Sequence, residues 1–246
     1  MNEIMTPSLD LETIAPLASF DIEMHIRLHP YDHERLEPVY AVLDEEIRAF
    51  SPISVEDNAL PFSGRVVQSY GAYLADHLEW TSRTLGDFLY HRGHEEFIVN
   101  KVVQAFKRHD IGKTLQPGLW KITEGKQNIS EGQKRERAMH AELGAGHIRK
   151  TFRRRLGDCS RNESAGIGIA EHLALMHHER LNGSGPQKKT AADMCPILRS
   201  ATIVDTFHGK LKAGKAADKI FDEMAGPKHE GEFDLPLLTK FREFYA

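Results

Sequence analysis

A histidine followed directly by an aspartate, His109-Asp110, is the feature that most constrains this chain. The apolar run Val102-Val103-Gln104-Ala105-Phe106 before it predicts a buried helix that delivers the pair into the core. Imidazole and carboxylate together suit borderline divalent metals such as iron, manganese and zinc, and the two oxygens of one aspartate can face two ions. We therefore expect a metal site inside a helical fold. Gly112 would end the helix, and Lys113 would extend a cation toward an anion held by the metal.

A His-Asp pair is common by chance, so the remaining composition decides its meaning. The chain has 14 histidines among 246 residues, an excess for which metal binding is the leading explanation. Two cysteines, Cys159 and Cys195, do not make a disulfide framework and indicate a cytoplasmic location. The formal net charge of −4 argues against general binding of long nucleic acids. The start shows no signal peptide, and no apolar run approaches the roughly 20 residues that span a bilayer, so we expect no membrane partner.

The first 60 residues form an N-terminal extension in this interpretation. Apolar residues recur at helical spacing from Leu36 to Phe50 and predict a helix there. His25, His29 and His33 recur every four residues, but Pro30 interrupts that helix and disfavours a metal site. We expect a small helical cap or a dimerisation element, through which the protein would form a homodimer.

A long helix from Arg65 to about Tyr90 is predicted after the loop Pro61-Phe62-Ser63-Gly64. His77 falls on its apolar stripe, in the middle of the helix. A core histidine that donates to a carbonyl is the plain alternative to a metal ligand, and no neighbouring residue favours the metal. A further helix is predicted from about Glu95 to Lys107, leading into the His-Asp pair.

Ser130 is expected to cap a later helix whose apolar side includes Met139. His140 and Gly144 lie four residues apart on one face, and a glycine there would let another backbone or a ligand approach closely. The run Arg153-Arg154-Arg155 indicates a solvated helix end, with attraction of phosphate as the alternative.

The densest stretch of candidate residues is His177-His178-Glu179-Arg180-Leu181-Asn182-Gly183-Ser184-Gly185-Pro186. A helix from about Glu163 delivers the two histidines near its end, and neighbours on a helix diverge by about 100°. They would therefore approach one site from different directions. Asn182-Gly183 and Gly185-Pro186 predict a tight turn with positive φ.

Asp205 lies within a strongly apolar helix predicted from Met194 to Phe207. A buried carboxylate needs a partner because burying an unpaired charge is costly, and a metal is a natural partner. His208, three residues later, could point into the same site. His172 is interpreted as structural, and four other histidines as surface residues: His91, His94, His147 and His229.

The order of these residues resembles the motifs of the HD-domain metal phosphohydrolases. The matching elements are a mid-helix His, then His-Asp-x-Gly-Lys, His-x-x-x-Gly, His-His-Glu-Arg-x-x-Gly-x-Gly and a late Asp. The closest resemblance is to the HD-GYP branch, whose characterised members hydrolyse cyclic di-GMP. It covers about residues 61–246 and includes the ending Phe233-Asp234-Leu235-Pro236-Leu237-Leu238. It implies an all-α fold: an HD-domain helical bundle over residues 61–246, with the N-terminal helical extension over residues 1–60.

The resemblance also implies two divalent transition-metal ions, iron or manganese, with zinc, nickel and magnesium as alternatives. One ion would be held by His77, His109, Asp110 and Asp205, and the other by His140, His177 and His178, with Asp110 bridging. Lys113 would bind the scissile phosphate or the bridging hydroxide. The substrate contacts assigned in addition are Arg180, Asn182, Lys210 and Lys212.

The sequence departs from the branch at several positions. Tyr73 stands where some members have a glutamate that holds a third metal, so two ions are expected. Gly185-Pro186 lacks the tyrosine that names the branch, and Asn182 stands where aspartate is usual. The basic motif after the late Asp205 is not recognisable, and Lys210, Lys212 and Lys215 are the nearest cations. These departures concern the substrate and leave the predicted ligands complete.

The implied activity is that of a binuclear metal-dependent phosphodiesterase acting on a nucleotide second messenger. A metal-bridging hydroxide would attack cyclic di-GMP and give linear pGpG. One alternative is a related phosphohydrolase that acts on another cyclic dinucleotide or on a mononucleotide. The other is a non-catalytic nucleotide-sensing or docking domain, against which the complete set of ligands argues.

Overall fold

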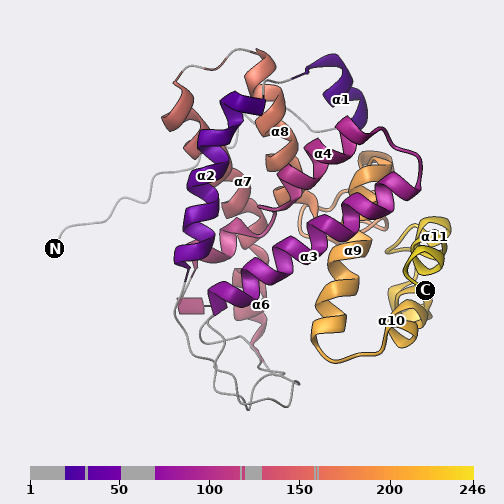
Figure 1. Ribbon diagram of the computed structural model, residues 1–246. Helices are drawn as coiled ribbons and strands as arrows, with labels where there is room; N and C mark the ends of the chain where they lie inside the picture. Colours follow the sequence, from indigo (N-terminus) through magenta and orange to yellow (C-terminus); the bar gives the residue numbers. More distant parts are fainter. Residues whose placement is uncertain are drawn as a thin grey trace.

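The computed structural model describes residues 20–30, 33–50, 70–116, 118–119, 129–157, 159 and 161–246. Within these residues the secondary structure is helical, and no β-strand forms apart from an isolated bridge between Asn182 and Thr190. The prediction of an all-α bundle is confirmed (Figure 1). None of the described helices is long and apolar enough to cross a lipid bilayer.

The described helices follow one another along the chain as α1 (Ile22–Leu28), α2 (His33–Ala49), α3 (Tyr70–His91), α4 (Glu96–Phe106), the 3-10 helix η3 (Ile111–Leu115), α6 (Glu131–Ala138), α7 (His140–Leu156), α8 (Arg161–Met176), η4 (Ala191–Asp193), α9 (Pro196–Lys212), α10 (Ala217–Ala225), η5 (Pro227–His229) and α11 (Leu235–Tyr245). The helices predicted from Leu36, Glu95, Glu163 and Met194 are confirmed as α2, α4, α8 and α9. The predicted start of the long helix that contains α3, and the loop before it, lie outside the described residues.

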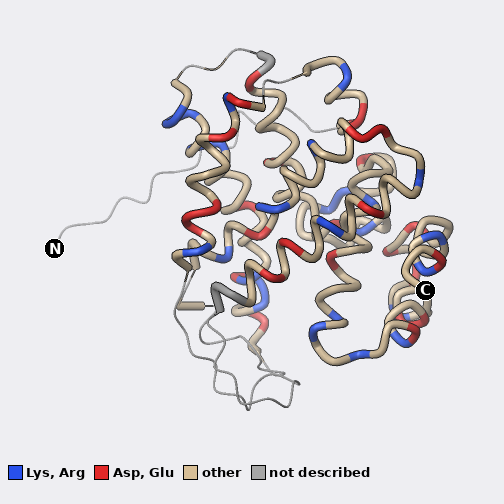
Figure 2. The backbone as a smooth tube through the Cα atoms, viewed as in Figure 1, with Lys and Arg blue, Asp and Glu red and all other residues tan. Residues whose placement is uncertain are grey.

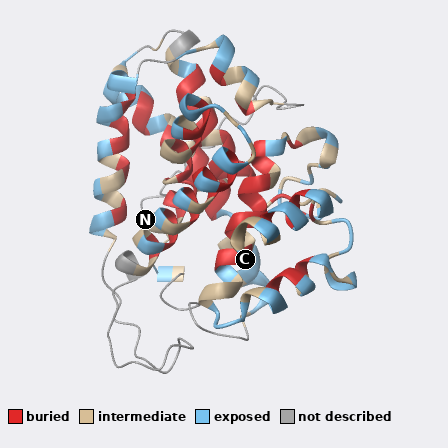
Figure 3. Cartoon of the chain, turned by 45° about the vertical axis from the view of Figure 1, so that its right-hand side comes forward, coloured by how far each residue is buried: buried red, intermediate tan, exposed pale blue. Residues whose placement is uncertain are grey.

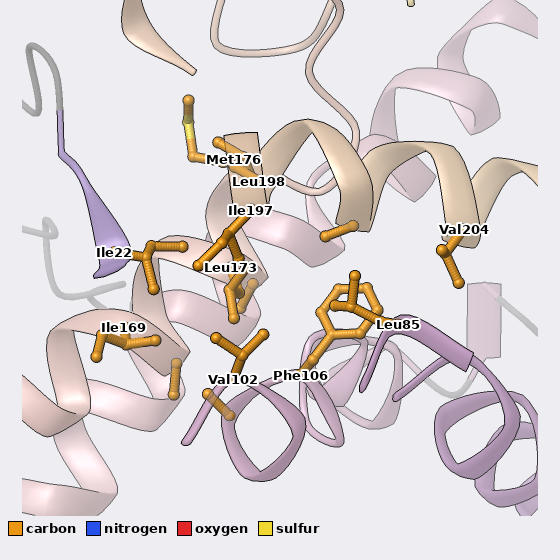
Figure 4. Packing of buried hydrophobic residues seen from close by; sticks show 14 of the residues in the cluster. Ile22, Leu85, Val102, Phe106, Ile169, Leu173, Met176, Ile197, Leu198 and Val204 are labelled. Atoms are coloured by element: carbon orange, nitrogen blue, oxygen red, sulfur yellow. The ribbon is translucent and has the colours of Figure 1, made fainter. Parts of the chain in front are cut away.

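Helices α3, α4, α7, α8 and α9 surround one apolar core, with buried residues on their facing sides (Figure 3). Leu85, Phe106, Leu173 and Val204 come from four of these helices and pack together there (Figure 4). All four side chains are inaccessible to solvent. Burying a side chain of this size stabilises the fold by about 1.5–3 kcal/mol, so the core holds rigid the helix ends from which the candidate ligands project.

The two N-terminal helices lie on this bundle and share its core. Helix α2 packs against α7 and α3, and α1 packs against α8. The apolar stripe of α2, including Leu36 and Leu43, is buried in the same cluster as the bundle residues. The boundary of the extension near residue 60 falls in the segment 51–69, outside the described residues, so the division into two domains stays a prediction.

An ion pair fastens α2 to the end of α4, next to the His-Asp pair. The Arg108 guanidinium donates to both carboxylate oxygens of Asp44, at 2.9 and 2.6 Å. It also lies over the Tyr40 ring, with its central carbon 4.2 Å from the ring centroid. A bidentate arginine–carboxylate pair fixes orientation as well as distance, so α2 restrains the residue that directly precedes His109.

Two sequence predictions about local structure are wrong. Helix α4 ends at Phe106, six residues before Gly112, which instead lies in η3. The helix capped by Ser130 is interrupted at Met139, whose side chain is 48% exposed and therefore not on an apolar side. The interruption starts a new helix at His140, so that this histidine occupies the first turn of α7.

Gly112 serves the packing of η3 against α7. A Cβ atom at Gly112 would overlap the carbonyl oxygen of His140 and lie 2.7 Å from the backbone nitrogen of Gly144. A Cβ atom at Gly144 would lie 3.0 Å from the Gly112 nitrogen. The close approach predicted for Gly144 is confirmed, and Gly112 is its partner.

Substitution of Gly112 by alanine tests this approach. We expect Gly112→Ala to lower the free energy of unfolding by about 3 kcal/mol or more, because the added methyl must displace backbone rather than a side chain. Gly168 in α8 has no atom within 4 Å of a Cβ position and serves as the control. Gly168→Ala should raise stability by up to about 1 kcal/mol. Urea denaturation of both variants measures the difference, and equal stabilities would contradict the packing described here.

Candidate metal centre

The seven predicted metal ligands lie together although they come from distant parts of the chain. His77 projects from α3, His109 and Asp110 from the turn after α4, and Asp205 from α9. His140 begins α7, and His177 and His178 follow α8 directly. They form two groups in which the ligand atoms lie within 4.8 Å of one another: His77, His109 and Asp205 in one, and Asp110, His140, His177 and His178 in the other.

Asp110 joins the two groups through its two carboxylate oxygens. Its Oδ1 lies 3.0 Å from Nε2 of His140 and 3.4 Å from Nε2 of His177. Its Oδ2 lies 3.3 Å from Nε2 of His77 and 3.7 Å from Nε2 of His109. Each oxygen therefore faces one group, which is the arrangement that a bridging carboxylate requires.

Asp205 closes the first group from the opposite side. Its Oδ1 lies 3.2 Å from Nε2 of His77 and 3.4 Å from Nε2 of His109. The same two imidazole nitrogens thus lie between two carboxylates, Asp110 and Asp205. His178 links the groups as well, with Nε2 at 3.1 Å from Nε2 of His140 and Nδ1 at 3.7 Å from Oδ2 of Asp205.

Backbone carbonyls orient three of the histidines in the same way. In each, Nδ1 lies at hydrogen-bonding distance from the carbonyl oxygen three residues earlier. The pairs are His109 with Phe106 at 2.8 Å, His140 with Arg137 at 2.5 Å, and His177 with Ala174 at 2.8 Å. A carbonyl only accepts, so Nδ1 carries the proton and Nε2 turns its lone pair toward the centre. This is the tautomer in which Nε2 can bind a metal ion.

The charges of the site suit a cation. Burial alone would raise the pKa of Asp110, but the Lys113 ammonium and the nearby imidazoles of His109, His140 and His177 hold it well below its usual value. Burial acts on Asp205 in the same direction, and its histidine contacts likewise hold its pKa well below the usual value. Both carboxylates are therefore ionised. Burial lowers the pKa of His140, which favours the neutral imidazole that binds metal.

Several of these atoms lack a hydrogen-bond partner among the described residues. Nε2 of His77, Nε2 of His109 and Oδ1 of Asp110 are buried and unpartnered. Leaving such a group unpaired costs about 1–3 kcal/mol, and each of the three atoms lies within 3.4 Å of another candidate ligand atom. Imidazole and carboxylate donors in this ratio fit iron, manganese or zinc. The residues present thus fit the two ions expected from the sequence.

His208 lies behind the site and belongs to neither group. Its Nδ1 is 2.7 Å from Nδ1 of His77, and its ring stacks on Trp80 with centroids 4.2 Å apart. It therefore orients His77 from the side away from Asp110. The structural interpretation of His172 agrees with its position: it is buried beside Phe20, and burial lowers its pKa to about 4.

A pocket of about 330 Å³ opens beside the two groups, and His77, His178 and Asp205 form part of its wall. The cations that line it are Lys113, Arg137, Arg180 and Lys210. Lys113 also contacts Oδ2 of Asp110 through its ammonium group. These cations would attract an anion into the pocket beside the two groups.

Two of the predicted substrate contacts, Asn182 and Lys212, lie outside the pocket lining. The Asn182 side chain donates to the Glu230 carbonyl at 3.2 Å and accepts from the Ser184 backbone at 3.0 Å, which builds the turn after α8. Lys212 donates to the Tyr73 carbonyl at 3.3 Å, with Nζ 4.0 Å from the centroid of the Tyr73 ring. Asn182 and Lys212 thus lie outside the residues that line the pocket, whereas Lys113, Arg180 and Lys210 are among them.

The sequence interpretation missed Glu179 and Arg137. The Glu179 carboxylate is fully buried and accepts from the backbone nitrogens of Gln187 and Lys189, both at 2.7 Å. A Cβ atom at Gly185 would lie 2.6 Å from Glu179, so the glycine lets the turn close over this carboxylate. The sequence signal for Glu179 was its position directly after the candidate ligands His177 and His178 and directly before a glycine-rich turn. Arg137 lies on the wall of the pocket, and its position one helical turn before His140 was the corresponding signal.

No protein-family model matches the chain, and no curated protein matches it. Solved structures match in fold. Bd1817, a HDG"Y"P protein from Bdellovibrio bacteriovorus, aligns with a TM-score of 0.58 at 12% identity, covering 91% of this chain and 68% of that chain. The HD domain of the L. monocytogenes phosphodiesterase PgpH aligns with a TM-score of 0.50 at 13% identity, covering 82% of this chain and 93% of that chain. A structure of that domain in complex with cyclic-di-AMP aligns with a TM-score of 0.47 at 15% identity, covering 82% of this chain and 92% of that chain.

At these identities the first two structures show the fold. The chain has an HD-domain fold that resembles the HD-GYP branch, so the resemblance inferred from the spacing of the motifs is confirmed at this level.

Metal analysis of purified variants tests the two groups. The wild type should carry close to two transition-metal ions per chain. Asp110→Ala should lose both, because one side chain serves both groups, whereas His140→Ala should lose the ion of its own group. His147→Ala is the control, since that half-buried histidine pairs with Glu46 away from the centre. Two ions retained in Asp110→Ala, measured by elemental analysis, would show that Asp110 is not the bridge.

Proposed function

We propose that this protein is a binuclear metal-dependent phosphodiesterase that hydrolyses a cyclic dinucleotide, with cyclic di-GMP as the first candidate and linear pGpG as its product. The observation that carries the proposal is the position of Asp110, whose two oxygens face two histidine groups beside a cationic pocket. The fold agrees, because it is shared with an HD domain of a protein described as a phosphodiesterase.

The donor set supports such a reaction. Two divalent ions in these groups, iron or manganese by our proposal, would lower the pKa of water to provide the nucleophile and neutralise charge on the phosphoryl group. The chain contributes two ionised carboxylates and five imidazoles. Two negative charges do not cancel those of two divalent ions, so the centre keeps a net positive charge and attracts a phosphodiester.

Lys113 has the position of a phosphate-binding cation. It follows Asp110 by three residues, contacts Oδ2 of that carboxylate and lines the pocket. Its ammonium therefore lies between the bridging carboxylate and the space open to substrate. In our proposal it binds a non-bridging oxygen of the phosphate under attack and stabilises the charge that develops there.

A cyclic dinucleotide carries a second phosphodiester, which needs its own partners. We assign Arg180 and Lys210 to it, because both line the pocket while Lys113 is the lining cation that contacts Asp110. Arg180 donates from Nη1 to the Glu179 carbonyl at 2.8 Å and from Nη2 to the Thr206 hydroxyl at 3.2 Å, and its Nε lies 3.4 Å from Glu232. A guanidinium has five N–H donors, so further donors can reach a phosphate. Asn182 and Lys212 would act on the substrate only through the turn and through Tyr73.

The substrate alternatives follow from the departures in the turn after α8. The Gly185-Pro186 pair lacks the tyrosine of the branch, so another cyclic dinucleotide, such as cyclic di-AMP, or a mononucleotide remains the alternative substrate. A non-catalytic sensing role is the weaker alternative, because the two groups hold a complete set of donors. We also propose a cytoplasmic enzyme, since Cys159 and Cys195 are both free thiols.

The test of the function is hydrolysis by iron- and manganese-loaded protein. The panel contains cyclic di-GMP, cyclic di-AMP, guanosine mononucleotides and the generic diester bis(p-nitrophenyl) phosphate. We expect hydrolysis of the generic diester and of one cyclic dinucleotide ahead of the mononucleotides. Tight nucleotide binding without turnover of any diester would instead support the sensing role.

Lys113→Ala separates phosphate binding from metal binding. The variant should keep both ions and lose about 10²–10³-fold in kcat, the usual effect of removing one preorganised charge partner from a transition state. Lys107→Ala is the control, because Lys107 pairs with Glu79 at 3.1 Å outside this pocket. Unchanged kcat in Lys113→Ala, with both metals bound, would remove Lys113 from the reaction.

A further inference from the structure

His229 lies between the two carboxylates that hold the pocket cations Lys210 and Arg180. Its Nδ1 is 2.9 Å from Oε2 of Glu232, and its Nε2 is 3.6 Å from Oε1 of Glu223. The sequence interpretation placed His229 on the surface, yet only 16% of its side chain is exposed. The residue belongs to η5, between α10 and α11, which pack beside α9 (Figure 1).

On one side, Glu232 holds Arg180. Its Oε2 lies 3.4 Å from Nε of the guanidinium, and its backbone carbonyl accepts from the nitrogen of Leu181 at 3.0 Å. The Arg180 guanidinium also lies over the Phe233 ring, 5.1 Å from its centroid. Arg180 is thus fixed from the C-terminal segment as well as from its own turn.

On the other side, Glu223 holds Lys210. Its Oε1 accepts from the Lys210 ammonium at 2.7 Å, and its Oε2 accepts from Lys215 at 2.5 Å. These two lysines lower the pKa of Glu223 to about 2. Helices α9 and α10, which carry Lys210 and Glu223, have positively and negatively charged residues (Figure 2). Lys210 therefore lines the pocket while it is paired with the Glu223 carboxylate.

The Glu223 carboxylate needs a second donor when Lys210 binds a substrate, and His229 is placed to provide it. If Lys210 turns toward a phosphate, Oε1 of Glu223 loses its 2.7 Å donor. Nε2 of His229 faces the same oxygen, is buried, and has no hydrogen-bond partner among the described residues. In its imidazolium form, which carries an N–H on each nitrogen, His229 can donate from Nε2 to Glu223 while Nδ1 still donates to Glu232 and so keeps Arg180 in place.

We propose that His229 is a positioning residue that sets Lys210 and Arg180 for the second phosphate of a dinucleotide substrate, acting through Glu223 and Glu232. This inference rests on the proposed phosphodiesterase function and deepens it. His229 does not touch substrate in this role. Its effect is specific to substrates that present a phosphate beyond the one at the metal centre.

The experiment compares two substrates in metal-loaded protein: the cyclic dinucleotide that the wild type hydrolyses best, and bis(p-nitrophenyl) phosphate, which has a single phosphodiester. For His229→Ala we expect the ratio of kcat/KM for dinucleotide over generic diester to fall about tenfold, the size of one charge-assisted hydrogen bond. The loss should appear in KM. Glu223→Gln is the second variant, and because it removes the charge that competes with the phosphate for Lys210, it should leave the ratio at or above the wild-type value.

Two further variants make the comparison specific. His229→Asn keeps a donor near the position of Nδ1 and should restore part of the ratio through Glu232. His94→Ala is the matched control, because His94 is similarly covered, 12% exposed, and pairs with Glu23 at 3.1 Å on another part of the surface. It should leave the ratio at the wild-type value.

Equal loss for both substrates, no loss in His229→Ala, or a loss that His229→Asn does not restore would overturn the positioning role. So would a wild type that cleaves the generic diester and no dinucleotide, although the proposed metal centre would then stand. A wild type that cleaves neither compound would contradict the proposed function and this inference together.

Discussion

The structure depends on placing the Asp110 carboxylate, ionised, at the centre of a helical core. Around it lie five imidazoles and a second carboxylate, all but His178 buried. A polar cluster of this kind is unfavourable unless its donors are oriented and its charge is balanced. Three histidines follow the C-terminal ends of helices, where backbone carbonyls lack partners within the helix. Those carbonyls accept from Nδ1 of His109, His140 and His177, so the helix ends orient the ligands.

The fold serves this centre at two levels. Apolar packing fixes the helices, and contacts at their ends fix individual rings: Phe106 stacks on His109 with centroids 4.2 Å apart, and His208 supports His77. The outer contacts concern the pocket instead. Glu179 closes the turn that carries Arg180, and α10, η5 and α11 bring carboxylates to the cations of α9 and of that turn. Metal binding and substrate preference would therefore respond to different substitutions.

Five of the seven candidate ligands could be found together from the sequence because they occur in short motifs beside the ends of helices, whereas His77 and Asp205 lie within α3 and α9. The pairing of Asp110 with both groups followed from the chemistry of one aspartate between histidines. Gly112 was misinterpreted because its role is a contact with α7, 28 residues away at His140, which local helix-ending rules do not contain. His229 was assigned to the surface for the same reason, since Glu232 meets Arg180 and Glu223 meets Lys210 only in the folded chain. Long-range contacts decided each of these errors.

Anomalous X-ray diffraction from crystals of manganese-loaded protein tests the central claim most directly. The account predicts two anomalous peaks about 3.5–4 Å apart, both at the Asp110 carboxylate. One should lie with Oδ1, His140 and His177, and the other with Oδ2, His77, His109 and Asp205. A single peak, or two peaks that do not share Asp110, would contradict the claim that this carboxylate bridges a binuclear centre.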